Sequence, residues 1–177
     1  VISEQQSIKL FVELIKPSIQ LVVMGSNYDI YPLLRQANDL DWQTVVVANP
    51  KKLDKLAFKF ADVVDDFNKV NIDAYTAAII MSHNYPKDKS NLEKALDSDL
   101  QYIGLLGPAT RRDDLLEDLG LNSTDSDLNR LYGPAGLDIG ANQPEEIANS
   151  IIAEIIAVMR NRDGQSLKNR NAPINPR

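Results

Sequence analysis

Polar side chains that could bind a ligand follow two of the short apolar runs in this sequence. One run ends at Met24 and continues as Gly25-Ser26-Asn27-Tyr28-Asp29, and another ends at Met81 and continues as Ser82-His83-Asn84. His83 is the only histidine of the chain. A histidine at the end of a strand can face a ligand and titrate near neutral pH, or it can order its own loop by bonding to the backbone. Both interpretations are open from the residues alone.

A third segment, Gly104 to Arg112, combines glycines with the start of a helical pattern and two arginines. After Gly107, free backbone N–H groups, the positive end of the helix dipole and the guanidinium groups of Arg111 and Arg112 would together suit an anion such as phosphate. The two arginines could instead pair with Asp114 and Glu117 along a solvated helix. The pattern favours the anion site narrowly.

The segment from Gly133 to Gly140 reads GPAGLDIG and is the last candidate. Its glycines favour unusual backbone angles close to a group that needs room, and Asp138 would be a polar anchor there. The alternative is a tight turn that leads into the helix that follows.

The elements that must position these residues are short apolar runs separated by helical patterns. The runs are Leu21–Met24, Thr44–Ala48, Ala61–Val64, Ala77–Met81 and Tyr102–Leu106. Helical patterns cover 30–37, 52–60, 87–96, 111–119 and a long stretch that begins at Pro144. The alternation predicts an α/β fold, a three-layer Rossmann-like arrangement with a mostly parallel sheet, helices on both faces and a long C-terminal helix. We expect the strand order 3-2-1-4-5, with ligands beyond the carboxyl ends of the strands.

Three segments of different character make up the predicted organisation. Residues 1–18 are expected to form an N-terminal helix or linker, because Ile8, Phe11, Val12 and Ile15 have helical spacing. Residues 19–160 form the Rossmann-type domain, with a long loop from 120 to 140 that holds one short strand near Leu131. Residues 161–177 are predicted to be a mobile basic tail.

Composition excludes several classes of function. The chain has 177 residues and a net charge of −6, which argues against a nucleic-acid binder. It has no cysteine and one histidine, so disulfides, thiolate metal sites and sites with two histidine ligands are impossible in this stretch. No apolar run reaches the length of about 20 residues that a membrane span requires. We expect a soluble, cytoplasmic domain without a membrane partner.

The first loop lacks most of the dinucleotide-binding pattern G-x-G-x-x-G. Only Gly25 is present; Asn27, which tolerates left-handed backbone angles, and Ile30 stand at the other two glycine positions. The second apolar run ends in Ala48-Asn49-Pro50, where an acidic residue would bind the ribose. Ordinary NAD(P) binding is therefore not expected.

Four stretches together resemble the carboxyl-terminal Rossmann domain of the XdhC/CoxI family. They are LVVMGSNYDIYPL at 21–33, SHN at 82–84, YIGLLGPATRR at 102–112 and GPAGLDIGANQPEEIANSIIAEIIAV at 133–158. The resemblance covers about residues 10–160. It implies an accessory protein that binds molybdenum cofactor (molybdopterin) as cargo and helps to mature a molybdenum hydroxylase such as xanthine dehydrogenase. Members of the family often carry the name xanthine dehydrogenase although they lack that enzyme's catalytic domains, so no activity of its own is expected.

The resemblance also implies which residues hold the cofactor, and no catalytic or metal-binding residue is among them. The implied residues are Gly25, Ser26, Asn27, Asp29, Ser82, His83, Asn84, Gly107, Arg111, Arg112 and Asp138. Two other functions stay open: an NAD(P)-dependent oxidoreductase that uses the same crevice, and a binding-deficient dimerisation scaffold. The wide apolar stripe of the last helix motivates the scaffold and the expected homodimer, because such a stripe must be buried within the chain or by another chain.

Overall fold

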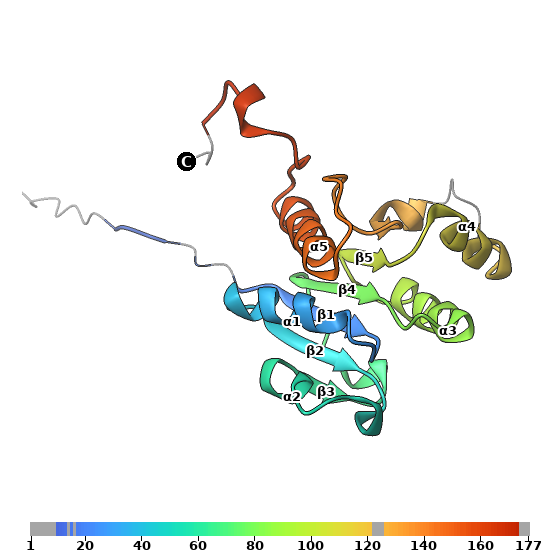
Figure 1. Ribbon diagram of the computed structural model, residues 1–177. Coiled ribbons are helices and arrows are strands. Elements are labelled where there is room, and N and C mark those ends of the chain that lie inside the picture. The colour runs from blue at the N-terminus through green and yellow to red at the C-terminus, as the bar shows by residue number, and fades with distance from the viewer. Residues whose placement is uncertain (1–9, 14, 16, 122–125, 174–177) are drawn as a thin grey trace, which may run out of the picture.

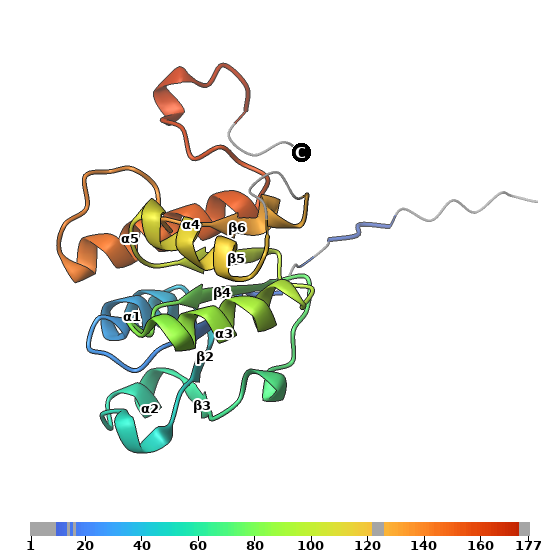
Figure 2. The same ribbon diagram turned by 90° about the vertical axis from the view of Figure 1, so that its right-hand side faces the viewer.

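The structure is a computed structural model that describes residues 10–13, 15, 17–121 and 126–173, and it contains a six-stranded parallel sheet. The strands are β1 (Gln20–Met24), β2 (Gln43–Val47), β3 (Asp62–Val64), β4 (Thr76–Ile80), β5 (Tyr102–Leu105) and β6 (Leu131–Tyr132). Their order is β3-β2-β1-β4-β5-β6 (Figures 1 and 2). The predicted α/β class and the order of the first five strands are confirmed. β6 pairs in parallel with β5 and extends the sheet by one strand.

Helices cover both faces of the sheet, because strands buried on both sides supply an apolar surface to each layer. They are α1 (Ile30–Asp39), α2 (Ala57–Phe60), α3 (Tyr85–Leu96), α4 (Ala109–Asp118) and α5 (Pro144–Met159). α1 and α5 pack on one face of the sheet, and α3 and α4 pack on the other. None of the helices in the described part of the chain is long and apolar enough to cross a bilayer.

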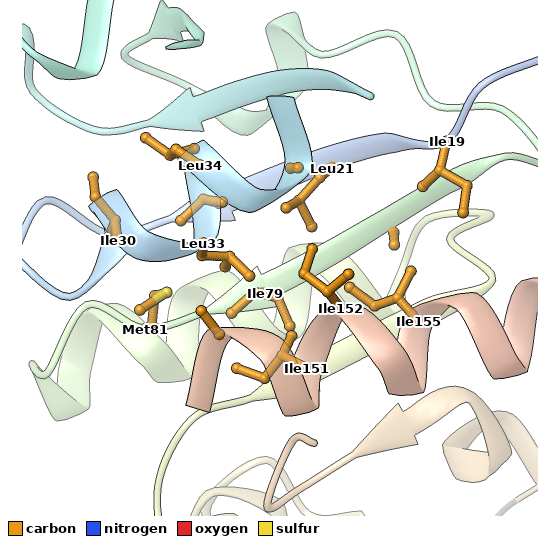
Figure 3. Close-up of a cluster of buried hydrophobic side chains, with 14 of the residues drawn as sticks. Ile19, Leu21, Ile30, Leu33, Leu34, Ile79, Met81, Ile151, Ile152 and Ile155 are labelled. Atoms are coloured by element: carbon orange, nitrogen blue, oxygen red, sulfur yellow. The ribbon is translucent and has the colours of Figure 1, made fainter. Parts of the chain in front are cut away.

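The core on the α1–α5 face explains the apolar stripe of the last helix. Leu21 and Ile79 point from the sheet towards Ile151 and Ile155 of α5, with Leu33 of α1 beside them (Figure 3). All five side chains are at most 1% exposed. Burial of each Leu or Ile contributes about 1.5–3 kcal/mol. The stripe that motivated a dimer is therefore largely buried within this chain, and the homodimer stays a prediction.

The segment expected to be an N-terminal helix or linker has no helix in its described residues, and one predicted helix is shorter than expected. The described residues of the predicted N-terminal helix, 10–13, 15 and 17–18, are not helical, and Figure 2 shows residues 10–13 extending away from the sheet. Phe11 is 90% exposed, so no surface in the described part of the chain stabilises a short helix there; residues 1–9, 14 and 16 lie outside the described part. The pattern at 52–60 yields a 3₁₀ turn at Pro50–Lys52 and only the short α2, because the Asp54 side chain accepts the Leu56 N–H and forms a local turn instead.

The segment between α4 and α5 returns along the edge of the sheet. The guanidinium group of Arg130 donates to the carbonyl oxygens of Leu96, Ser98 and Leu100, and β6 follows directly. The Ala135 N–H then donates to the carbonyl of Leu105 at the end of β5 (3.1 Å). This anchoring places residues 133–143 over the carboxyl edge of the sheet.

Candidate functional site

A cavity of about 840 Å³ lies at the carboxyl edge of the sheet, on the face that α1 and α5 cover. Its walls come from the loop before α1, the segments that follow β4 and β5, and residues 134–151. Four residues of the predicted site line it, namely Asp29, His83, Gly107 and Asp138. The volume lies within the range of small-molecule sites. The expected place of the site, beyond the carboxyl ends of the strands, coincides with this cavity.

The lining is mostly apolar and carries no permanent positive charge. Leu33, Met81, Leu106 and Ile147 are among the apolar wall residues. Of the described residues that line the cavity, none is a lysine or an arginine. The ionisable side chains of the described wall are therefore two carboxylates, Asp29 and Asp138, the imidazole of His83 and the hydroxyl of Tyr28.

Asp29 and His83 form the polar centre of the cavity wall. The Nε2 atom of His83 lies 2.5 Å from Oδ2 of Asp29, which joins the β1–α1 loop to the turn after β4. The Asp29 side chain is 15% exposed and that of His83 is 48% exposed. The other carboxylate oxygen, Oδ1, is buried and has no hydrogen-bond partner. His83 thus binds a side chain of a neighbouring loop rather than its own backbone.

The backbone at His83 adopts a positive φ of 53°. This left-handed conformation is uncommon for residues other than glycine. Asn27, for which the sequence suggested this conformation, is not among the described residues with positive φ. Its carbonyl oxygen instead accepts the Ile30 N–H at 3.2 Å and helps to start α1.

The glycine loop over the cavity is held from behind by Glu154 of α5. Oε2 of Glu154 accepts the Gly136 N–H (2.8 Å) and the Tyr102 hydroxyl (2.6 Å). Burial raises the pKa of the Tyr102 hydroxyl well above its usual value, and the nearby Glu154 carboxylate adds to this. Gly136 has a φ of 110°, and a Cβ there would overlap Oγ of Ser150. Only glycine lets the loop lie this close to α5.

On the other face of the sheet, Arg111 takes part in a buried polar cluster around Asp88 of α3. Its Nη2 donates to Oδ2 of Asp88 at 2.6 Å, and Asp88 is 1% exposed. Oδ1 of Asp88 accepts the N–H (3.1 Å) and the hydroxyl (2.5 Å) of Ser82. Arg111 and Ser82 therefore stabilise the turns after β4 and β5 and do not line the cavity.

Arg112 supports the glycine loop from outside. Its Nη1 donates to the carbonyl oxygen of Gly133 at 2.5 Å, and its Nε donates to Asp113 at 2.8 Å. The acidic partners are therefore Asp88 of α3 for Arg111 and Asp113, the next residue of α4, for Arg112, rather than Asp114 and Glu117. The phosphate-binding role of the two arginines stays a prediction, and it would require these bonds to be exchanged for bonds to phosphate.

The remaining predicted residues have structural surroundings. Gly25 allows close approach of β1 to the segment after β4, because a Cβ there would lie 2.5 Å from the carbonyl oxygen of Met81. Asn84 caps α3 by accepting the Lys87 N–H at 3.1 Å. Ser26 and Asn27 belong to the β1–α1 loop and are not among the residues that line the cavity.

Sequence reasoning missed two carboxylates that organise this region. Glu154 interrupts the apolar run IIAEII, and a lone charge inside an apolar helix was the available signal. Asp88 gave no such signal, because its helix is polar on most sides. Within the described ranges, no group of three or more His, Asp or Glu side chains could hold a metal ion.

Residues 21–155 match the XdhC Rossmann domain. The chain belongs to the XdhC family. A probable xanthine dehydrogenase subunit of Bacillus subtilis (strain 168) is 32% identical over 160 residues, which cover 85% of this chain and 46% of that protein. An uncharacterised protein of Escherichia coli (strain K12), YqeB, is 33% identical over 79 residues, 44% of this chain and 15% of its own length.

A solved structure shows the same architecture. The crystal structure of a xanthine dehydrogenase from Bacillus halodurans superimposes with a TM-score of 0.72 at 34% identity, over 82% of this chain and 45% of that chain. This XdhC Rossmann domain thus spans less than half the length of these relatives. The comparisons confirm the predicted family and fold.

Proposed function

We propose that this chain binds molybdenum cofactor as cargo in the cavity at the carboxyl edge of the sheet and helps to mature a xanthine dehydrogenase-type molybdenum hydroxylase in the cytoplasm. Membership of the XdhC family supports the link to xanthine dehydrogenase, as does the Bacillus subtilis relative, which is named as a probable subunit of that enzyme. The observation that carries the binding proposal is the cavity, which collects Asp29, His83, Gly107 and Asp138 at one place.

The character of the cavity suits cargo that must be released. Apolar walls with few polar groups give moderate affinity, and the described residues offer no cluster of metal ligands that would hold the molybdenum itself. NAD(P) is less suitable, because Ala48 follows β2 and the next side chain, Asn49, is already bonded to the Lys51 N–H. The hydroxylase and a second copy of this chain are the proposed protein partners.

Co-purification tests the proposed function. The full chain is purified from cells that make molybdenum cofactor, and bound molybdopterin is oxidised to its fluorescent derivative and quantified per chain. The variant Ala141→Trp fills the cavity, since Ala141 lines it and is only partly buried. The matched variant Ala74→Trp places the same side chain at an exposed position before β4, at the opposite edge of the sheet.

We expect the wild-type chain and Ala74→Trp to retain molybdopterin and Ala141→Trp to lose most of it. Wild-type protein with no more molybdopterin than a blank preparation would contradict the binding proposal. Equal retention by the two tryptophan variants would show that the cofactor binds outside this cavity. A calorimetric titration with NAD(P) on the same preparation tests the oxidoreductase alternative, for which we expect no heat of binding.

A further inference from the structure

The carboxylate of Asp29 has an acceptor that no group in the protein satisfies. Oδ2 is bonded to Nε2 of His83 at 2.5 Å, whereas Oδ1 is buried and has no partner. Within the described ranges, Oδ1 of Asp29 is the single buried side-chain nitrogen or oxygen atom without a hydrogen-bond partner. An unsatisfied buried acceptor is costly for the fold, so such groups are rare and often belong to functional sites.

The electrostatics of the cavity indicate what kind of group would satisfy this oxygen. Asp29 and Asp138 both line the cavity, and the described lining contains no lysine or arginine. The two arginines nearest in sequence to Gly107 are bonded to Asp88 and to the Gly133 carbonyl instead. The cavity therefore favours a ligand group that donates N–H bonds and disfavours a phosphate at its wall.

We propose that Asp29 binds the N–H edge of a 2-amino-4-oxopyrimidine ring. A pterin and a guanine base share this edge, on which N3–H and the 2-amino group point in the same direction and match the two oxygens of a carboxylate. This inference rests on the function proposed above and assigns which part of the cargo the cavity wall recognises. It places the ring, rather than the phosphate, at the centre of recognition.

The Asp29–His83 bond is compatible with this role. An ionised carboxylate offers about four acceptor positions, and His83 occupies one of them on Oδ2. Because Oδ1 is buried whereas the side chain as a whole is 15% exposed, the carboxylate turns about its Cβ–Cγ bond on binding, so that each oxygen accepts one ligand N–H. His83 is then a positioning residue, which fixes the carboxylate from the side of the β4 turn.

The apolar walls supply the remaining contacts that a flat ring requires. Leu33, Met81, Leu106 and Ile147 line the same cavity as Asp29. A ring placed against them loses water from its faces, while its donor edge exchanges water for the carboxylate. Because these side chains carry no charge, the donor edge is what would discriminate between rings of similar size.

Direct titration of the full chain tests the proposal with unphosphorylated pterin, lumazine, GMP, AMP and inorganic phosphate as probes. Lumazine is a pteridine in which a carbonyl oxygen replaces the 2-amino group, so it tests the same contact on unmodified protein. We expect binding of pterin, at least tenfold weaker binding of lumazine and no competition by AMP or phosphate. Competition by GMP as strong as that of pterin would assign the site to guanine nucleotides, and weak competition would assign it to pterins.

The variant Asp29→Asn keeps the shape of the side chain but places an amide donor against the ligand donors. We expect about tenfold weaker pterin binding or more, with an unchanged or raised thermal midpoint, because the unsatisfied acceptor carries less charge. Asp62→Asn is the matched control, since it makes the same chemical change at an exposed position of β3 outside the cavity, and we expect less than a twofold change in affinity.

The outcomes separate this inference from the proposed function. If the wild-type chain binds molybdopterin and Asp29→Asn binds it equally well, the role of Asp29 is wrong and the proposed function stands. If the wild-type chain binds pterin or GMP but not molybdopterin, the edge recognition stands and the proposed cargo is wrong. Equal affinity for pterin and lumazine, or no binding of any of these ring probes, would overturn the inference.

Discussion

Asp29 and Asp88 lie at the same edge of the sheet, one on each face, and their surroundings differ. Asp88 is 1% exposed and accepts three hydrogen bonds, two from Ser82 and one from Arg111. Asp29 accepts one bond from a half-exposed histidine and keeps a buried oxygen without a donor. Both carboxylates follow strands that are easy to recognise in the sequence, yet only Asp88 has hydrogen-bond donors from the described residues on both of its oxygens.

The difference separates a structural carboxylate from a candidate ligand-binding one. A buried charge with a complete set of donors fixes the elements that supply them, in this case the β4 turn, α3 and the start of α4. A carboxylate with an open acceptor contributes less to the fold and leaves an interaction for a ligand. The comparison therefore predicts that equal substitutions at the two positions have unequal effects.

The largest expected difference is in the free energy of unfolding of Asp88→Asn and Asp29→Asn. Asp88→Asn breaks a buried ion pair with Arg111 and is expected to cost about 3 kcal/mol. Asp29→Asn is expected to change stability by less than about 1 kcal/mol, because the bond to His83 is partly exposed. Urea unfolding of both variants measures the difference, and equal losses would show that Asp29 is as structural as Asp88.

A smaller effect is expected where the glycine loop meets α5. Gly136→Ala forces a side chain into a backbone at φ 110° and against Ser150, with an expected cost of about 2–3 kcal/mol. Gly120→Ala is the control, because Gly120 also has positive φ (70°) but no atom of the described residues within 4 Å of its missing Cβ. We expect about 1 kcal/mol there. Equal costs in thermal unfolding would mean that the contact with Ser150 has no effect.

The smallest effect concerns Tyr102, which supports the loop through Glu154. Burial holds the pKa of Tyr102 in the folded state well above the ordinary value of 10.0. The unfolded chain therefore loses this proton first, and stability falls as the pH rises above about 10. Tyr102→Phe removes one hydrogen bond, at a cost of about 1 kcal/mol of stability near neutral pH. The variant also lacks the part of the stability loss at alkaline pH that the titration of Tyr102 causes.

The stabilities of wild type and Tyr102→Phe should therefore converge as the pH rises from about 9 to about 11. Unfolding by urea at several pH values measures this convergence. A difference that is constant with pH would show that Tyr102 titrates alike in both states.

The sheet could be predicted from the sequence because continuous apolar runs such as Leu21–Met24 are typical of strands buried on both faces. The long α5 was equally clear, since Pro144 and two acidic residues begin an apolar helical pattern. The described residues around Phe11, where the spacing indicated a helix or linker, are not helical, because their apolar side chains have no partner surface in the described part of the chain. Periodicity indicates what a segment can bury but not whether a surface is present.

Residue types and spacing determined the family, the order of the first five strands and the edge at which a ligand would bind. They placed Asp29, His83, Arg111 and Arg112 at that edge but could not divide them between the two faces of the sheet. That division arises from side-chain partners that are distant in sequence, such as Arg111 with Asp88 and Gly136 with Glu154. Only the folded chain brings those donors and acceptors together, so only the tertiary structure decided which polar groups of the described residues are hydrogen-bonded and that Oδ1 of Asp29 is not.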